Sequence, residues 1–182
     1  MTTDDLDCRC LICEDHGDGL DDADARLVAT VSDPGWGVLT MTDDETDTVW
    51  AFTVGLWHSF RAPEVAMFGL RPPTMTRCLN HVGNLVADGR TLAAGDDVGA
   101  VFGDGLPSRL TPVDAAWHKI LFGTSVGFYG STLAVPFLQL LWPDPNSRFP
   151  GEPGFAPEFT GWQPMLWLGP DRHPAGTWTA QV

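Results

Sequence analysis

The sequence predicts an α+β fold in which about three helices pack against a mostly antiparallel sheet or small barrel. Strand-like segments are separated by hairpin-length connections, whereas helical spacing of apolar residues recurs in only three segments. Of the 182 residues, 43% are hydrophobic, which is enough for one core. We therefore expect a single domain, 1–182, with an acidic cysteine-containing segment at 1–34, an α+β core at 35–142 and a wrap rich in proline, glycine and aromatic residues at 143–182.

The first part of the chain predicts a helix followed by a β-hairpin. Apolar residues recur at helical spacing over residues 20–31, and Asp33-Pro34-Gly35 ends that helix. Residues 36–41 and 49–57 have the composition of strands. Because a short acidic turn separates these two segments, a hairpin is their simplest pairing.

The middle of the chain predicts a third strand and the clearest helix. Residues 64–70 are the strand candidate. Pro72-Pro73-Thr74 then begins a helix, whose apolar stripe runs from Met75 to Val86. Asp88-Gly89 ends this helix.

A short strand at 98–102 and a third helix are expected next. Thr111 has the position of a helix cap, Pro112 the first helical position, and Asp114 lies three residues after the cap. The helix should run to about residue 122, where Gly123 closes it.

The last predicted strand lies in the apolar run at 133–142. Pro136 lies inside this run and has no N–H to donate to a ladder, so we expect an edge strand or a bulge. The chain beyond residue 142 is rich in proline and glycine but also in phenylalanine and tryptophan. Such a segment is expected to wrap the core.

The charge distribution argues against a nucleic-acid partner. The net charge is -14, and residues 1–47 alone carry -12. A chain this acidic repels phosphate backbones, so we expect no nucleic-acid partner. The absence of a long apolar run and of a basic leader predicts no membrane segment and a cytoplasmic protein. The acidic segment is a solvated collar, a cation site or a dock for a basic partner, and the oligomeric state is open.

A series of ordered blocks follows the N-terminal cysteine cluster along most of the chain: Gly35-Trp36, residues 52–58, Pro63-Glu64, Phe68-Gly69-Leu70, Pro112-Val113 with Trp117, residues 139–144, Arg148-Phe149-Pro150 and Glu152-Pro153-Gly154. In these blocks the chain resembles a bacterial family catalogued as domain of unknown function 4262. This resemblance implies a fold relative and transfers no activity.

The strongest chemical signal is the series Cys8-x-Cys10-x-x-Cys13-x-x-His16. Three thiols and an imidazole within nine residues suit zinc, and clustered cysteines in a reducing compartment indicate metal or redox work. Cys78 or another residue could complete the site in place of His16. Free thiols and redox or iron–sulfur chemistry are the alternatives. A closed four-ligand site would be structural and would fasten the acidic segment to the body.

A second candidate is the segment Trp57-His58-Ser59, at the predicted end of a strand. Glu64 follows six residues later and could pair with His58 as a catalytic acid and base. The alternative is that both side chains only make structural hydrogen bonds at strand ends.

A third candidate is an aromatic pocket for a flat ligand. Trp57, Tyr129 and Trp142 would line it, while Asp144 and Arg148 would supply polar contacts. A surface turn with an Asp144–Arg148 pair, together with core packing of Tyr129, explains the same residues without a ligand.

Two classes of function follow from these candidates. The first is a small-molecule or partner-binding domain with a structural zinc site. The second is an enzyme: a cofactor-free isomerase, cyclase or hydrolase that uses His58 and Glu64, or a flavin-dependent protein similar to split barrels, with Thr53, Ser59 and Arg61 near the phosphate. Motifs of serine hydrolases, NTPases and Rossmann proteins are absent from the sequence.

Overall fold

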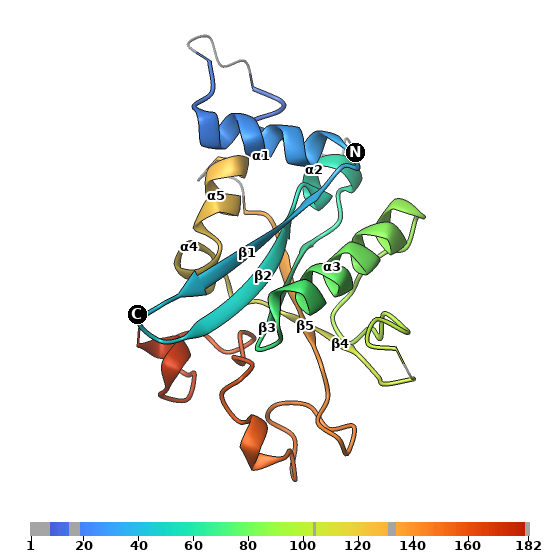
Figure 1. The fold of residues 1–182 in the computed structure, drawn as a ribbon, viewed down its shortest axis with the longest axis vertical. Helices are drawn as coiled ribbons and strands as arrows, with labels where there is room; N and C mark the ends of the chain where they lie inside the picture. Colours follow the sequence, from blue (N-terminus) through green and yellow to red (C-terminus); the bar gives the residue numbers. More distant parts are fainter. Residues whose placement is uncertain (1–7, 15–18, 104, 131–133, 181–182) are drawn as a thin grey trace, which may run out of the picture.

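A five-stranded open sheet forms the centre of the molecule in the computed structural model, which describes residues 8–14, 19–103, 105–130 and 134–180 (Figure 1). The strand order is β1-β2-β3-β5-β4, and every pair is antiparallel except β3 with β5. The strands are β1 Gly37–Asp43, β2 Thr48–Val54, β3 Glu64–Phe68, β4 Arg109–Pro112 and β5 Phe137–Leu141. This arrangement confirms the predicted α+β class, but the sheet does not close into a barrel.

Five α-helices surround the sheet in the described part of the chain, rather than about three. They are α1 Asp22–Ser32, α2 Leu56–Phe60, α3 Pro72–Ala87, α4 His118–Leu121 and α5 Gly123–Tyr129. Three short 3-10 helices, η1 Ala115–Trp117, η2 Pro157–Phe159 and η3 Thr177–Thr179, complete the set. The two longest helices, α1 and α3, confirm the helices predicted from apolar periodicity, and none of the described helices is long and apolar enough to cross a membrane.

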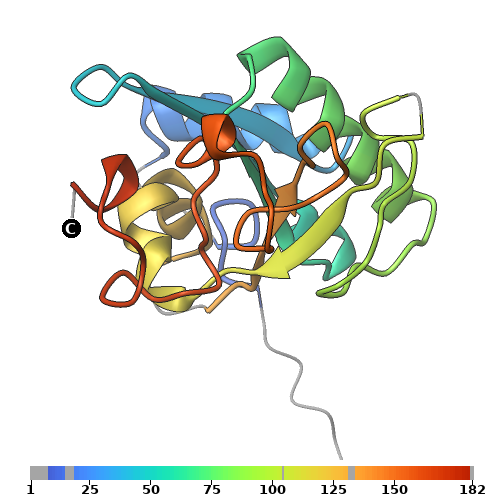
Figure 2. The same cartoon turned by 90° about the horizontal axis from the view of Figure 1, so that it is seen from below.

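The two faces of the sheet bury two separate apolar clusters, because side chains alternate along each strand. Ala51, Val65 and Met67 belong to the cluster that contains the apolar stripe of α3. Phe52 and Phe68 point to the other cluster, which α1, α4 and α5 cover. Figure 2 shows α3 and α5 on opposite sides of the sheet.

The position of β5 corrects the prediction of an edge strand or bulge. β5 lies inside the sheet, paired in parallel with β3 and antiparallel with β4. Pro136 precedes the strand, where its missing N–H costs no ladder bond, and its carbonyl accepts a hydrogen bond of 3.0 Å from the Glu64 N–H.

Two other local predictions were wrong. Residues 98–102 form turns rather than a strand, and the Val98 N–H donates to the Ser108 hydroxyl at 2.9 Å. Thr111 and Pro112 belong to β4, and the helical segment begins after Asp114, whose carboxylate accepts from the Ala116 N–H at 3.0 Å. The cap is therefore an aspartate three residues downstream of the expected threonine.

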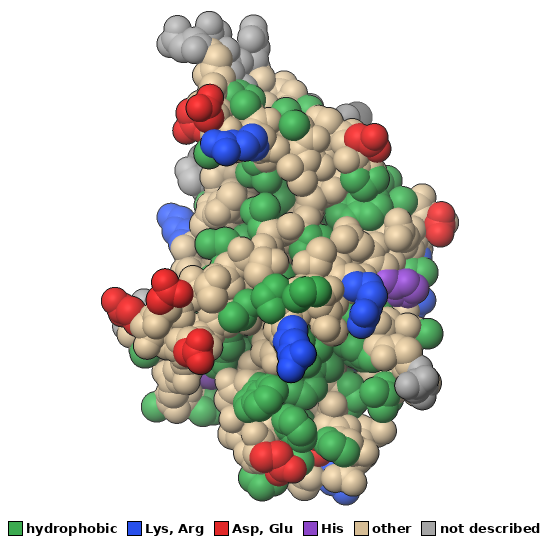
Figure 3. Space-filling view, viewed as in Figure 1, with side chains coloured by type: hydrophobic (Ala, Val, Ile, Leu, Met, Phe, Trp, Pro, Cys, Tyr) green, Lys and Arg blue, Asp and Glu red, His purple; other side chains and the backbone are tan. Residues whose placement is uncertain are grey.

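Glutamine side chains attach the C-terminal segment 143–180 to β5. The Gln139 side chain donates to the Pro164 carbonyl at 2.8 Å and accepts from the Leu166 N–H at 3.3 Å. Gln163 in turn bonds to both backbone groups of Trp142, at 3.1 and 2.9 Å. Hydrophobic side chains gather on the face shown in Figure 3, over the part where this segment lies in Figure 1.

Replacing a glycine by alanine inside a helix normally stabilises a protein. The contact between α3 and Trp36 predicts the opposite effect at Gly83. A Cβ on Gly83 would lie 2.2 Å from Cε2 of Trp36, so Gly83→Ala should lower the free energy of unfolding by about 1–3 kcal/mol through overpacking. Gly127→Ala is the matched control, because nothing lies within 4 Å of its Cβ position in α5. That control should raise stability by about 0.5–1 kcal/mol. Urea unfolding measures both, and a stabilised Gly83→Ala variant would contradict the packing described.

Candidate metal centre

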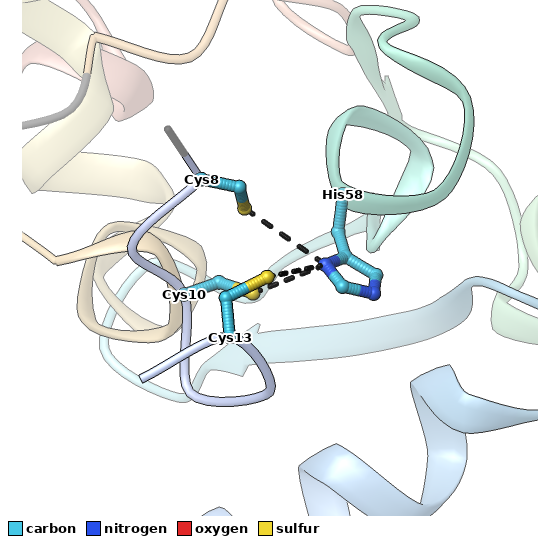
Figure 4. A group of neighbouring side chains, drawn as sticks. All are labelled: Cys8, Cys10, Cys13 and His58. Carbon is cyan, nitrogen blue, oxygen red and sulfur yellow. Dashed lines mark hydrogen bonds between the residues drawn. The ribbon is translucent and has the colours of Figure 1, made fainter. Parts of the chain in front are cut away.

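Three cysteines from the N-terminal segment meet one histidine from α2. The Nδ1 atom of His58 lies 3.8 Å from the Sγ of Cys8, 3.2 Å from that of Cys10 and 3.4 Å from that of Cys13. Figure 4 shows all three thiols pointing toward this nitrogen. The four atoms lie within 4.8 Å of one another, which places four zinc-type donors around one point.

Hydrogen bonding alone does not explain this cluster. An imidazole nitrogen donates or accepts one proton, so it cannot satisfy three thiols at once. Tetrahedral zinc bonded to sulfur and nitrogen at its usual distances separates neighbouring S and N donors by about 3.6 Å. The observed distances from Nδ1, 3.2 to 3.8 Å, bracket that value. The donor set therefore fits one tetrahedral metal ion.

The cysteine loop is held by a turn and by α5. The N–H groups of Cys13 and Glu14 donate to the Cys10 carbonyl at 2.9 and 3.1 Å, which curls the chain so that Cys10 and Cys13 face the same way. The Leu11 N–H donates to the Phe128 carbonyl at 2.9 Å. Cys10 is fully buried in the same apolar cluster as Phe128. The loop is therefore packed onto the end of α5.

Burial shifts the pKa values of Cys10, Cys13 and His58 in the direction that favours their neutral forms. It raises the pKa of Cys10 to about 12 and also raises that of Cys13. Burial lowers the pKa of His58, and the positive charge of Arg61 lowers it further. Burial thus favours the neutral imidazole that a metal ligand must be, whereas thiols bind a metal as thiolates, which the charge of the cation stabilises.

α2 carries His58, and a buried carboxylate from β3 holds its N-terminus. Glu64 is fully buried, and its Oε1 atom accepts from the N–H groups of Gly55 at 3.0 Å and Trp57 at 3.1 Å. The Tyr129 hydroxyl donates to the same oxygen. Free N–H groups at a helix start need such acceptors, and β2 turns into α2 at Gly55 with φ 109°.

Thr53 and Tyr129 complete this network. The Thr53 hydroxyl donates to Oε2 of Glu64 at 2.5 Å and accepts from the Val65 N–H at 2.9 Å. The Tyr129 hydroxyl accepts from the N–H groups of Gly55 at 2.9 Å and His58 at 3.4 Å. Burial raises the pKa of Glu64, while the hydrogen bonds from Thr53 and Tyr129 act in the opposite direction.

The predicted catalytic pair is not hydrogen-bonded. Glu64 bonds to the four groups named above, and His58 directs Nδ1 at the cysteines, so no hydrogen bond joins the two side chains, both of which are described.

Residue His16, predicted as the fourth metal ligand, lies outside the described residues. The alternative Cys78 is buried in α3 with its Sγ 3.6 Å from the Val101 carbonyl.

The three residues considered for a flavin phosphate have other partners. Thr53 donates to Glu64, and Ser59 donates to the Gly35 carbonyl at 2.7 Å. Arg61 has a left-handed backbone, with φ 56°, and its guanidinium donates to the Trp57 and His58 carbonyls at 3.0 and 3.3 Å. These contacts end α2.

The predicted pocket residues make separate contacts in the structure and do not form one pocket. Trp142 is buried and donates to the Phe68 carbonyl at 2.8 Å, whereas Tyr129 belongs to the Glu64 network. Asp144 is buried and accepts from the N–H groups of Asn146, Arg148 and Ala156, which makes it the centre of a turn. Two further predicted residues are placed separately: the Arg148 guanidinium donates to the Pro153 carbonyl, and Trp57 is half-buried in α2.

A cleft of about 430 Å³ lies between the β1–β2 turn and the C-terminal segment. Trp162 and Trp178 line it together with Asp47 and Leu70. The Trp162 side chain is 49% exposed, yet it packs edge-on against Trp142 with ring centroids 6.1 Å apart. The volume lies within the range usual for ligand pockets, and two indole rings contribute to the lining. The sequence pattern drew attention to the aromatic tail, which contains Trp162, but not to Trp178.

Comparison with known proteins confirms the family resemblance. The family described as Domain of unknown function (DUF4262) matches residues 30–156, which is more than half of the chain. The match contains His58, Glu64 and Tyr129 but begins after the three cysteines. No curated protein and no solved structure matches the chain.

The hydrogen-bond network around Glu64 gives a direct stability prediction. Thr53→Val keeps the shape of the side chain but leaves the Val65 N–H and one carboxylate oxygen without this partner. It should lower the free energy of unfolding by about 1–3 kcal/mol, because both groups are buried. Thr53→Ser retains the hydroxyl and is the control. Equal urea midpoints for the valine variant and the wild type would show that the bond contributes nothing.

Proposed function

The chain belongs to the DUF4262 family, and we propose that it is a zinc-binding protein whose Cys8, Cys10, Cys13 and His58 hold one structural ion. The observation that carries this proposal is the single imidazole nitrogen surrounded by three thiols at 3.2 to 3.8 Å. Soft thiolates with an imidazole favour zinc over calcium or magnesium. With four protein donors the coordination shell is full, and a full shell is typical of structural rather than catalytic zinc.

The ion would act as a staple. Its cysteine ligands precede the part of the chain that matches the family, while its histidine lies within that part. Zinc would therefore fasten the acidic N-terminal segment to the sheet through α2. All four described cysteines are unpaired, so the centre also suits a reducing compartment such as the cytoplasm.

Elemental analysis and chelation test whether a zinc ion is bound and whether it stabilises the fold. We expect one zinc per chain in the wild type, and its loss in Cys10→Ser and His58→Ala. Removing the ion should lower the free energy of unfolding by about 3–4 kcal/mol if zinc is present at 100 to 1,000 times its dissociation constant. Calorimetry with and without chelator measures this difference.

Matched variants identify the ligands. Cys78→Ser removes a buried thiol of α3 and should leave the zinc content unchanged. His16→Ala separates the two histidines: retained zinc supports His58 as the fourth ligand, whereas loss of zinc in His16→Ala with retention in His58→Ala assigns that role to His16. Wild-type protein that binds no zinc after refolding with the ion would end the proposal.

The cleft at Trp162 favours small-molecule binding as a second function. Its volume of about 430 Å³ lies within the usual range for ligand sites, and the half-exposed indole offers a rigid stacking surface. The recognition surface would then lie in the C-terminal segment, away from the metal ligands.

A thermal-shift screen against common metabolites tests the cleft. Compounds that raise the melting temperature of the wild type should lose this effect in Trp162→Ala. Leu106→Ala is the control, because it removes the other large apolar side chain that is exposed among the described residues. Hits that survive Trp162→Ala, or a screen without hits, would count against binding at this place.

A further inference from the structure

We infer that Glu64 and Tyr129 are positioning residues of the metal centre: they hold the N-terminus of α2 and thereby fix the imidazole of His58 beside the cysteines. This inference rests on the proposed zinc site. It gives the buried carboxylate a role different from that of a catalytic acid or base.

The first step of the argument is that α2 cannot hold its own shape. It has five residues, and a helix this short is unstable without external contacts. Its N-cap is Gly55, which has no side chain to accept hydrogen bonds from the first turn. The acceptors come instead from Glu64 in β3 and Tyr129 in α5.

The second step is that these acceptors are rigid. Glu64 and Tyr129 are 0% and 1% exposed, and each bonds to the other. Thr53 of β2 fixes the second carboxylate oxygen at 2.5 Å. Two strands of the sheet and α5 therefore fix the orientation of α2, rather than the loop that follows it.

The third step is that α5 holds both halves of the centre. The Phe128 carbonyl accepts from the Leu11 N–H at 2.9 Å, between Cys10 and Cys13 in sequence. The adjacent residue, Tyr129, accepts from the N–H of His58 at 3.4 Å. Two consecutive residues at the end of α5 thus fix the cysteine loop and the histidine relative to each other. Metal affinity depends strongly on such support of the ligands.

The role assigned to Glu64 requires an acceptor at Oε1 and no particular charge. Glu64→Gln retains a carbonyl oxygen for Gly55, Trp57 and Tyr129, and its amide can donate to the Thr53 hydroxyl, which then turns. Glu64→Ala removes the acceptor altogether. An acid or base needs the carboxyl group itself, so the glutamine variant separates positioning from proton transfer.

The experiment measures zinc affinity by competition with a chelating dye, together with the visible spectrum of the cobalt-substituted protein. Tyr129→Phe and Glu64→Ala should weaken zinc binding on the order of tenfold or more and distort the tetrahedral cobalt spectrum. Glu64→Gln should bind zinc almost as tightly as the wild type. Tyr129→Phe keeps its ring in the core and decides the question if Glu64→Ala does not fold.

Trp50→Phe is the stability control. It removes a buried hydrogen bond of 2.9 Å to the Leu121 carbonyl, which is not one of the hydrogen bonds that hold α2. Wild-type zinc affinity in Tyr129→Phe, or a loss no larger than that in Trp50→Phe at equal stability, would overturn the positioning role while leaving the zinc site intact. A wild-type chain that binds no zinc would instead overturn the proposed function, and this inference with it.

Discussion

The hydrogen bonds of the buried Glu64 carboxylate are the interactions on which the arrangement of α2, α5 and the adjoining strands depends. Removing a carboxylate from water costs several kcal/mol unless hydrogen bonds replace the lost solvent. Here the donors are the hydroxyls of Thr53 and Tyr129 and the backbone N–H groups of Gly55 and Trp57. One side chain therefore joins β2, β3, α2 and α5. The two sequence blocks that contain Thr53-Val54-Gly55 and Pro63-Glu64 both belong to this network, which Tyr129 completes.

Much of the fold could be predicted because its larger elements follow simple periodicity. α1, α3 and the β1–β2 hairpin have long apolar patterns bounded by proline, glycine or acidic turns. α2 has only five residues, too few for a helical period, so the sequence assigns its first two residues to the preceding strand. Pro136 inside the apolar run predicts an edge position for β5, but the strand begins one residue after this proline.

Only part of the candidate site can be predicted from neighbouring residues in the sequence; the rest depends on contacts between distant residues. The three cysteines lie within six residues, so their spacing alone indicates a metal centre. His58 is 45 to 50 residues away in sequence, and only the turn at Gly55 brings it to them. No local pattern distinguishes a histidine that meets distant thiols from one at an ordinary strand end. Glu64 likewise looks like a proton carrier in sequence, since its backbone partners become visible only in three dimensions.

The parallel pairing of β3 with β5 has a consequence for how the chain is made. Residues 64–66 pair with residues 137–139, so the centre of the sheet joins parts of the chain that leave the ribosome far apart in time. The hairpin and β3 can form early, but one edge of β3 stays unpaired until β5 has been synthesised. That edge is fully buried and apolar apart from Glu64 in the finished sheet. During translation it is therefore an open strand edge with which another nascent chain can pair.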